Sequence, residues 1–161
     1  MDISNGEGVG ISLFVQGCHF HCKNCFNSST WDFEGGKEWT KETKEEFLAL
    51  ASRPHIKRVS ILGGEPLAKE NLIDVLDLVN EIKLSYPKKN IWLYSGYTWN
   101  EVFCGENETR KRIVSMCDVM VDGRFVDELQ DISLKWRGSS NQNVIDVKES
   151  IKQDKLILYC D

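Results

Sequence analysis

Residues 10–25 read GISLFVQGCHFHCKNC, and this stretch determines how the rest of the chain is interpreted. Its first eight residues are mostly apolar, are rich in strand-forming types, and end at Gly17. Such a run predicts a buried strand that leads directly to Cys18. Cys18, Cys22 and Cys25 follow with the spacing Cys-x3-Cys-x2-Cys, so three thiols stand on one short loop at the end of a strand.

The three thiols indicate a metal centre. Iron–sulfur clusters take thiolate ligands, usually four of them. Three ligands would leave one iron coordinatively open, as catalytic metal sites keep one position free. We therefore expect a [4Fe-4S] cluster on Cys18, Cys22 and Cys25, with the open iron available to a second cofactor.

Two other metal centres are compatible with these cysteines. His19 or His21 could complete a zinc site, although zinc ligands usually come as two separated pairs. A conventional four-thiolate cluster would need Cys104 or Cys117. Those two cysteines, like Cys160, lie in or beside apolar stretches, where free cysteine usually behaves as a small buried hydrophobe.

Composition excludes several classes of protein. The chain has 161 residues, of which 41% are hydrophobic and 28% charged, and its net charge is -5. This is the profile of an ordinary soluble globular protein, and the acidic balance does not favour a nucleic-acid partner. No apolar run approaches the roughly 20 residues of a membrane helix, and residues 1–6 lack the features of a signal peptide. We expect a cytoplasmic protein whose thiols stay reduced.

Strand-like and helix-like segments alternate along the chain. Short apolar runs predict further strands at residues 57–62, 91–94 and 118–121, and short edge strands at 144–147 and 156–159. Apolar periodicity predicts helices at about residues 43–53, 72–82 and 108–116. Capping-box spacings at Thr43–Glu46 and Thr98–Glu101 predict two helix starts, whereas residues 124–143 are irregular.

This alternation predicts an α/β fold with a mostly parallel sheet. A complete eight-stranded barrel needs about 250 residues, so a (β/α) barrel made by 161 residues must be partial and laterally open. We expect one domain over residues 1–161, with a core at about 8–125 and a C-terminal extension at 126–161.

Polar or glycine-rich segments follow the carboxyl ends of the predicted parallel strands. These segments are residues 18–27, 63–66, 95–97 and 122–124. Parallel α/β folds place their chemistry at this edge of the sheet, and we therefore expect the four segments to form one site.

The cysteine spacing and one further motif resemble a known superfamily. Cys-x3-Cys-x2-Cys at the end of a first strand, with Gly63-Gly64-Glu65-Pro66 one βα unit later, is similar to the signature of radical S-adenosylmethionine enzymes. Within it, the chain resembles the activating proteins of anaerobic (class III) ribonucleotide reductases. The segments that carry this resemblance are residues 5–9, 17–31, 94–98, 118–125 and 136–142.

The resemblance implies a mechanism and a set of site residues. S-adenosylmethionine would bind the open iron, and one electron from the cluster would cleave it to a 5′-deoxyadenosyl radical. Gly63, Gly64, Glu65 and Pro66 would hold the methionine end of the cofactor. The remaining expected contacts are Asn24, Cys25 and Phe26 on the nucleoside side, Ser95 at the ribose or carboxylate, and Asp122 as a catalytic residue near the cofactor.

The resemblance also implies a protein substrate. The radical would remove hydrogen from a glycine of the partner reductase, and a flavodoxin or a ferredoxin would supply the electron. Arg124, Arg137 and residues 138–142 are expected near that partner. The open alternatives are an activase of another glycyl-radical enzyme, another small radical S-adenosylmethionine enzyme, and a non-catalytic zinc or electron-transfer iron–sulfur module.

Overall fold

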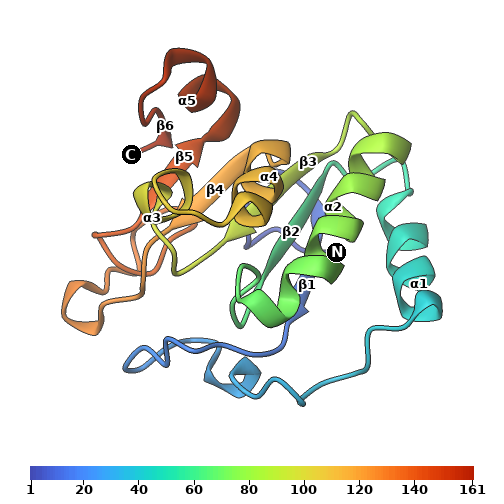
Figure 1. The fold of residues 1–161 in the computed structure, drawn as a ribbon, viewed down its shortest axis with the longest axis horizontal. Helices are drawn as coiled ribbons and strands as arrows, with labels where there is room; N and C mark the ends of the chain where they lie inside the picture. Colours follow the sequence, from blue (N-terminus) through green and yellow to red (C-terminus); the bar gives the residue numbers. More distant parts are fainter.

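Six strands form one sheet and stand in it in the order in which they occur along the chain (Figure 1). The computed structural model describes residues 1–161. The strands are β1 (Gly10–Val15), β2 (Arg58–Gly63), β3 (Asn90–Tyr94), β4 (Val119–Asp122), β5 (Asn143–Asp146) and β6 (Leu158–Cys160). β1 to β4 are parallel and β5 and β6 are antiparallel, which confirms the predicted mostly parallel, open α/β sheet. The prediction of an edge position for β5 is wrong, because β5 pairs with β4 on one side and β6 on the other.

Helices cover one face of this sheet. The helices are α1 (Lys41–Ala51), α2 (Leu72–Ser85), α3 (Trp99–Phe103), α4 (Glu108–Met116) and α5 (Val147–Gln153), with 3-10 turns η1 (Ser28–Thr30), η2 (Lys69–Asn71) and η3 (Asp127–Leu129). Figure 1 shows α2 and α4 side by side in front of the strands, and the buried apolar core joins these helices to the sheet. No helix in the structure combines the length and the apolar character needed to span a membrane.

Helix starts follow local side-chain chemistry. The capping box at Thr98 and Glu101 is present at the start of α3, as predicted. The predicted start at Thr43 is wrong: α1 begins one turn earlier, because the Thr40 side chain accepts a hydrogen bond from the Thr43 N–H. α5, which the sequence pattern did not reveal, begins where Asp146 accepts from the Glu149 N–H.

Strand alternation separates the two faces of the sheet. In β3, Ile91 and Leu93 belong to the core beneath the helices, whereas Trp92 belongs to a second apolar cluster on the other face. In β4, Met120 faces the helices and Val121 faces the second cluster. Successive side chains of a strand point to opposite faces, so residues two apart in a strand face the same side and have the same parity. The parity of a residue therefore determines whether it can line a site on the face that the helices leave free.

A buried arginine fastens the N-terminal segment over that second face. The Arg58 side chain is fully buried and donates to the Asp2 carbonyl and to the Asn5 carbonyl, both at 2.9 Å, while Nη1 lies 3.4 Å from the Asp2 carboxylate. A Cβ at Gly6 would lie 2.5 Å from the Arg58 side chain, so glycine is needed for this close approach. Residues 2–8 are thereby held across the sheet, and Asn5 reaches the wall of the cavity described next.

Candidate functional site

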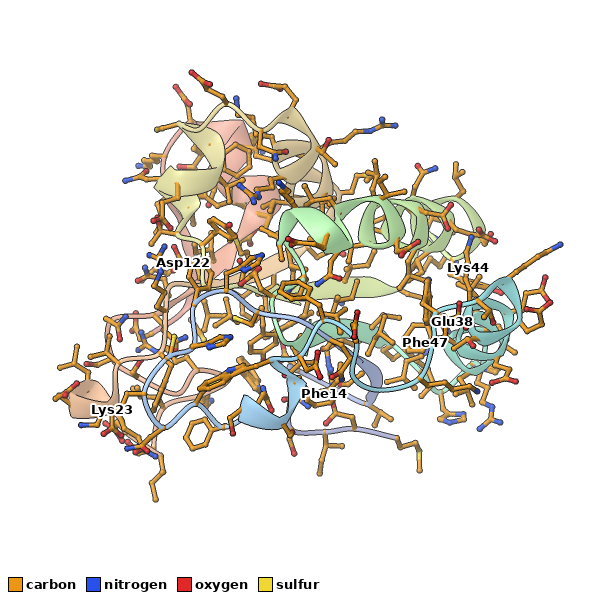
Figure 2. All side chains as sticks on the ribbon, turned by 60° about the horizontal axis from the view of Figure 1, so that its bottom comes forward. Phe14, Lys23, Glu38, Lys44, Phe47 and Asp122 are labelled. Carbon is orange, nitrogen blue, oxygen red and sulfur yellow. The ribbon has the colours of Figure 1, made fainter.

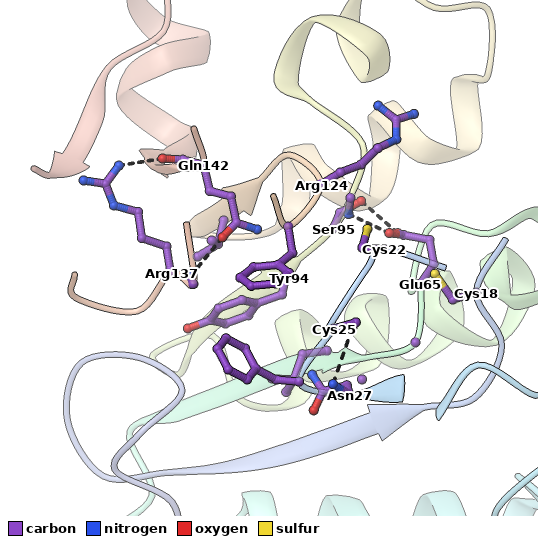
Figure 3. A pocket seen from close by; sticks show the side chains of 18 of the residues that line it. Cys18, Cys22, Cys25, Asn27, Glu65, Tyr94, Ser95, Arg124, Arg137 and Gln142 are labelled. Atoms are coloured by element: carbon purple, nitrogen blue, oxygen red, sulfur yellow. Dashed lines mark hydrogen bonds between the residues drawn. The ribbon is translucent and has the colours of Figure 1, made fainter. Parts of the chain in front are cut away.

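A cavity of about 480 Å³ lies at the carboxyl ends of the parallel strands. All three cysteines of the loop after β1 line it, together with Gly63, Gly64 and Glu65 after β2 and Ser95 and Gly96 after β3. Gly123 and Arg124 after β4 complete this part of the lining (Figure 3). The four strand-end segments therefore meet at one site, as the strand order of a parallel sheet requires.

The cysteine loop is held on both sides by backbone hydrogen bonds. Gly17 N–H donates to the Thr30 carbonyl at 2.7 Å and Cys18 N–H to the Trp31 carbonyl at 3.0 Å. His21 and Asn24 have φ values of 49° and 57°, a backbone region that side chains rarely adopt and that often marks functional sites. The loop thus turns twice within the eight residues that carry the thiols.

The far side of the cysteine loop contacts the loop that follows β4. Asn24 donates to the Asp127 carboxylate at 2.9 Å, and Lys23 lies 3.8 Å from the same carboxylate. Figure 2 shows Lys23 beside that loop, at the opposite end of the molecule from Lys44 on α1. The two loops therefore form one wall of the cavity together.

The donor set of the cavity fits an iron–sulfur cluster. Burial raises the pKa of the Cys18 and Cys22 thiols, so the metal-free loop holds them protonated and ligation must release protons. The buried indole N–H of Trp31, which also lines the cavity, has no hydrogen-bond partner in the chain. Such a donor suits a cluster sulfide, because hydrogen bonds to sulfur tune cluster potentials.

The two histidines that could complete a zinc site make contacts with other side chains. His19 lies 2.9 Å from the Glu70 carboxylate, and the His21 ring stacks on Trp31 with centroids 4.4 Å apart. Cys117 is buried in the core, as predicted, whereas Cys104 is exposed, so the prediction of burial was wrong for it.

Glu65 connects two of the strand-end loops. Its carboxylate is buried and accepts hydrogen bonds from the Gly96 N–H at 2.7 Å, the Ser95 hydroxyl at 2.8 Å and the Leu67 N–H at 2.8 Å. Burial raises the pKa of Glu65 to about 7, against the lowering effect of these hydrogen bonds. The group is therefore poised between its neutral and charged forms near neutral pH.

The neighbouring Gly64 has a packing role. A Cβ on this residue would lie 2.5 Å from the Gly17 carbonyl oxygen and 2.8 Å from the Thr30 carbonyl oxygen. Both oxygens belong to the backbone around the cysteine loop, and each already accepts a 2.7 Å hydrogen bond. Gly64 therefore lets the Gly63–Glu65 turn press directly against that loop.

Three of the expected site residues do not line the cavity. They are Asn24, Pro66 and Asp122. Asn24 turns to Asp127, whereas Asp122 accepts from the Trp99 N–H at 2.8 Å and from the Asn143 backbone and side chain at 3.1 Å. Asp122 has the same strand parity as Met120, which packs beneath the helices, so its carboxylate points away from the cavity.

Several lining residues were not among the expected cofactor contacts. These are Asn5, Phe14, Tyr94, Arg124, Trp136 and Arg137. Strand alternation could have identified Tyr94, because Tyr94 lies two residues after Trp92 in β3 and therefore faces the same side of the sheet. Val121, which pairs with Tyr94 in the register of β3 and β4, faces that side as well. Arg124 lies over the Phe20 ring at 4.3 Å, a contact between two loops that no sequence spacing indicates.

Comparisons with known proteins agree with this geometry. The family described as "4Fe-4S single cluster domain" matches residues 4–145. The chain is 41% identical over 146 residues to the anaerobic ribonucleoside-triphosphate reductase-activating protein of Escherichia coli (strain K12), covering 89% of this chain and 92% of that protein. Proteins of the same name from Vibrio cholerae and from Enterobacteria phage T4 are 40% and 34% identical, over 88% and 89% of this chain and 90% and 87% of their own lengths.

Proposed function

The chain belongs to the family of anaerobic ribonucleoside-triphosphate reductase-activating proteins, and on that premise we propose how its own residues carry out the activation. The protein activates an anaerobic ribonucleotide reductase through a radical S-adenosylmethionine domain that carries a [4Fe-4S] cluster. Its partner is that reductase. When bound, the cluster and S-adenosylmethionine supply the one-electron chemistry that removes a hydrogen atom from a glycine of the partner.

Cys18, Cys22 and Cys25 hold the cluster in this proposal. The observation that carries it is that all three thiols open into the same cavity as the Gly63–Glu65 turn and Ser95. The loop bears no fourth thiol, so a cluster held by these three cysteines would keep one iron available to a second ligand. The buried Trp31 indole N–H, which has no partner in the chain, would be the donor to a cluster sulfide.

Glu65 and the Gly63-Gly64 turn hold the methionine end of the cofactor in this proposal, and Ser95 orients Glu65 by donating to its carboxylate at 2.8 Å. The Glu65 Oε1 accepts one hydrogen bond, from Gly96, and keeps an acceptor position for an ammonium group. A cation at this position would favour the charged form of Glu65 and lower its pKa from about 7. Phe26, which packs against Phe125 with centroids 5.1 Å apart, supplies an apolar surface at the nucleoside side.

Asn24, Pro66 and Asp122 do not line the cavity, so we propose supporting roles for Asn24 and Asp122 in place of direct cofactor contacts. Asp122 orders the start of α3 and the start of β5 through its hydrogen bonds, so it supports the site from behind. Asn24 fixes the cysteine loop to Asp127. The reduction of the cluster requires a one-electron donor, and we extend the proposal to a flavodoxin or a ferredoxin as that donor.

The proposal is tested by anaerobic reconstitution with iron and sulfide, reduction, and addition of S-adenosylmethionine and the purified reductase. We expect 5′-deoxyadenosine and an EPR signal of a glycyl radical on the reductase, both absent with Cys22→Ser. Cys104→Ser is the matched control, because Cys104 is exposed and outside the cavity, and it should retain both signals. A Cys22→Ser protein that keeps its iron and its activity would contradict the assignment.

A further inference from the structure

Two hydrogen-bond donors on one side of the cavity have no partner in the protein. The hydroxyl of Tyr94 and the Nε of Arg137 are buried atoms without a hydrogen-bond partner in the chain. Both residues line the cavity, and Figure 3 shows them on the opposite side from Cys18 and Glu65. Buried polar groups in native proteins are rarely left unpaired, so two such donors indicate a ligand with acceptor atoms.

The backbone of β3 places Tyr94. Tyr94 is the last residue of the strand and has the same parity as Trp92, so its ring lies on the face opposite the helices. Phe14, Val121 and Trp136 line the same cavity. Burial in these apolar surroundings raises the pKa of the Tyr94 hydroxyl well above its ordinary value, so the group is a neutral donor near neutral pH.

A strained turn places Arg137. The preceding residue, Trp136, has a φ of +59°, which is unusual for a bulky side chain. Its ring is fixed edge-on against Trp92, with centroids 5.0 Å apart. The Arg137 Nη1 donates to the Gln142 carbonyl, and the Gln142 side chain accepts from the Gly138 N–H at 2.9 Å. These contacts orient the guanidinium and leave its Nε as the unpaired donor. Strained backbone that the surroundings enforce is common at binding sites.

The chemistry of this side of the cavity suits a polypeptide main chain. The thiols and Glu65 are taken up by the cofactors in the proposed function, and Cys18, Cys22 and Glu65 lie on the side away from Arg137 (Figure 3). A main chain offers an uncharged carbonyl acceptor at every residue, which matches a neutral hydroxyl among aromatic rings. A glycine also lets the main chain approach closely, because it has no side chain to meet Phe14 or Trp136.

We propose that Tyr94 and Arg137 bind the main chain of the reductase segment that carries the glycine, each donating a hydrogen bond to a backbone carbonyl oxygen. This inference rests on the proposed function and assigns the part of the site that recognises the protein substrate. The two donors set the position of the segment, so that the glycine enters the cavity in one register. They act on the reductase and leave the cofactor untouched.

The test separates recognition of the reductase from cleavage of the cofactor. Tyr94→Phe removes only the hydroxyl, whereas Arg137→Lys keeps the charge but loses both the Nε donor and the Nη1 hydrogen bond to the Gln142 carbonyl. Tyr86→Phe is the control, because Tyr86 caps α2 and lies outside the cavity. For each cluster-loaded variant, 5′-deoxyadenosine is measured without reductase, and glycyl radical formation is measured against reductase concentration. The Kd for the reductase is measured separately by biolayer interferometry.

Each cavity variant should raise the half-saturating reductase concentration and the Kd by about five- to tenfold, the effect of one lost hydrogen bond. Cleavage without reductase should stay within about twofold of wild type, as should iron content. Unchanged reductase binding in both variants would overturn the inference. A loss of cleavage equal to the loss of activation would also overturn it, because the donors would then serve the cofactor.

A failure of the proposed function has a different signature. In that case the wild-type chain itself forms no glycyl radical on the reductase, whatever the variants do. The Kd values still decide the present inference, since they do not depend on turnover.

Discussion

Replacing Gly64 by alanine tests whether the glycine-rich turn is packed against the cysteine loop. The added Cβ would lie 2.5 Å and 2.8 Å from two carbonyl oxygens, those of Gly17 and Thr30. Neither oxygen can move freely, because Gly17 accepts from the Glu65 N–H and Thr30 accepts from the Gly17 N–H, each at 2.7 Å. Overpacking of this kind costs about 1–3 kcal/mol, and backbone neighbours place Gly64→Ala near the upper value. A loss of about 3 kcal/mol lowers the melting temperature of a chain of this size by about 6–12 °C.

The assay is anaerobic thermal unfolding of the metal-free, reduced protein, followed by iron analysis after reconstitution. Gly35→Ala is the matched control: Gly35 also has an ordinary φ, but its nearest neighbour is the flexible Gln16 side chain at 3.0 Å. The control should change stability by less than about 1 kcal/mol. If Gly64→Ala unfolds within about 2 °C of wild type and takes up the same amount of iron, the turn does not press on the cysteine loop and the reasoning is refuted.

Three further outcomes are expected. Burial raises the pKa of Glu65 to about 7, so its carboxylate becomes protonated as the pH is lowered from about 8 to about 6. The affinity for S-adenosylmethionine, measured by anaerobic calorimetry, should fall over this range, and Glu65→Gln should abolish the pH dependence. Burial alone would raise the pKa of Asp118, but hydrogen bonds from Lys148, Lys83 and the Ile91 N–H outweigh this effect and lower the pKa from its ordinary value. Ionised Asp118 therefore stabilises the fold above its unfolded-state pKa, and this stabilisation is lost as the pH falls through its folded-state pKa. In urea titrations at pH 7, Asp118→Asn should be less stable than wild type by about 1–3 kcal/mol, and the difference should be smaller toward pH 3. Thr98→Ala should remove the α3 cap and cost about 1 kcal/mol in the same titrations, and an unchanged midpoint would show that the cap contributes nothing.

The succession of strands and helices, and the edge of the sheet where the strand-end loops meet, were predictable because they follow from local signals. Apolar runs that stop at Gly17, Gly63 and Gly96 mark strands followed by turns, and parallel strands must bring those turns to one edge. The start of α1 was predicted one turn too late, since Thr43 has the better capping-box spacing, whereas Thr40 is the residue whose hydroxyl accepts the bond. Spacing identifies a possible cap, but the path of the preceding chain selects among candidates.

The orientation of the side chains at the strand ends was predicted only in part. Asp122 was expected in the cavity from its place at the end of β4, yet Val121 has the parity that faces the cavity. The same rule, applied to β3, would have pointed to Tyr94.

Contacts between distant loops were beyond any local pattern. Arg58 binds the carbonyls of Asp2 and Asn5, more than fifty residues earlier in the chain, and only the folded structure reveals such pairs.

EPR of the reduced, iron-loaded chain before and after addition of S-adenosylmethionine tests most directly whether Cys18, Cys22 and Cys25 hold a cluster with one iron open to that cofactor. The wild-type chain should bind about four irons and give a cluster spectrum that changes when S-adenosylmethionine is added. The Cys104→Ser control should behave in the same way, and Cys22→Ser should bind little iron. A fully loaded wild-type cluster whose spectrum is unaffected by saturating S-adenosylmethionine would contradict an open iron in this cavity.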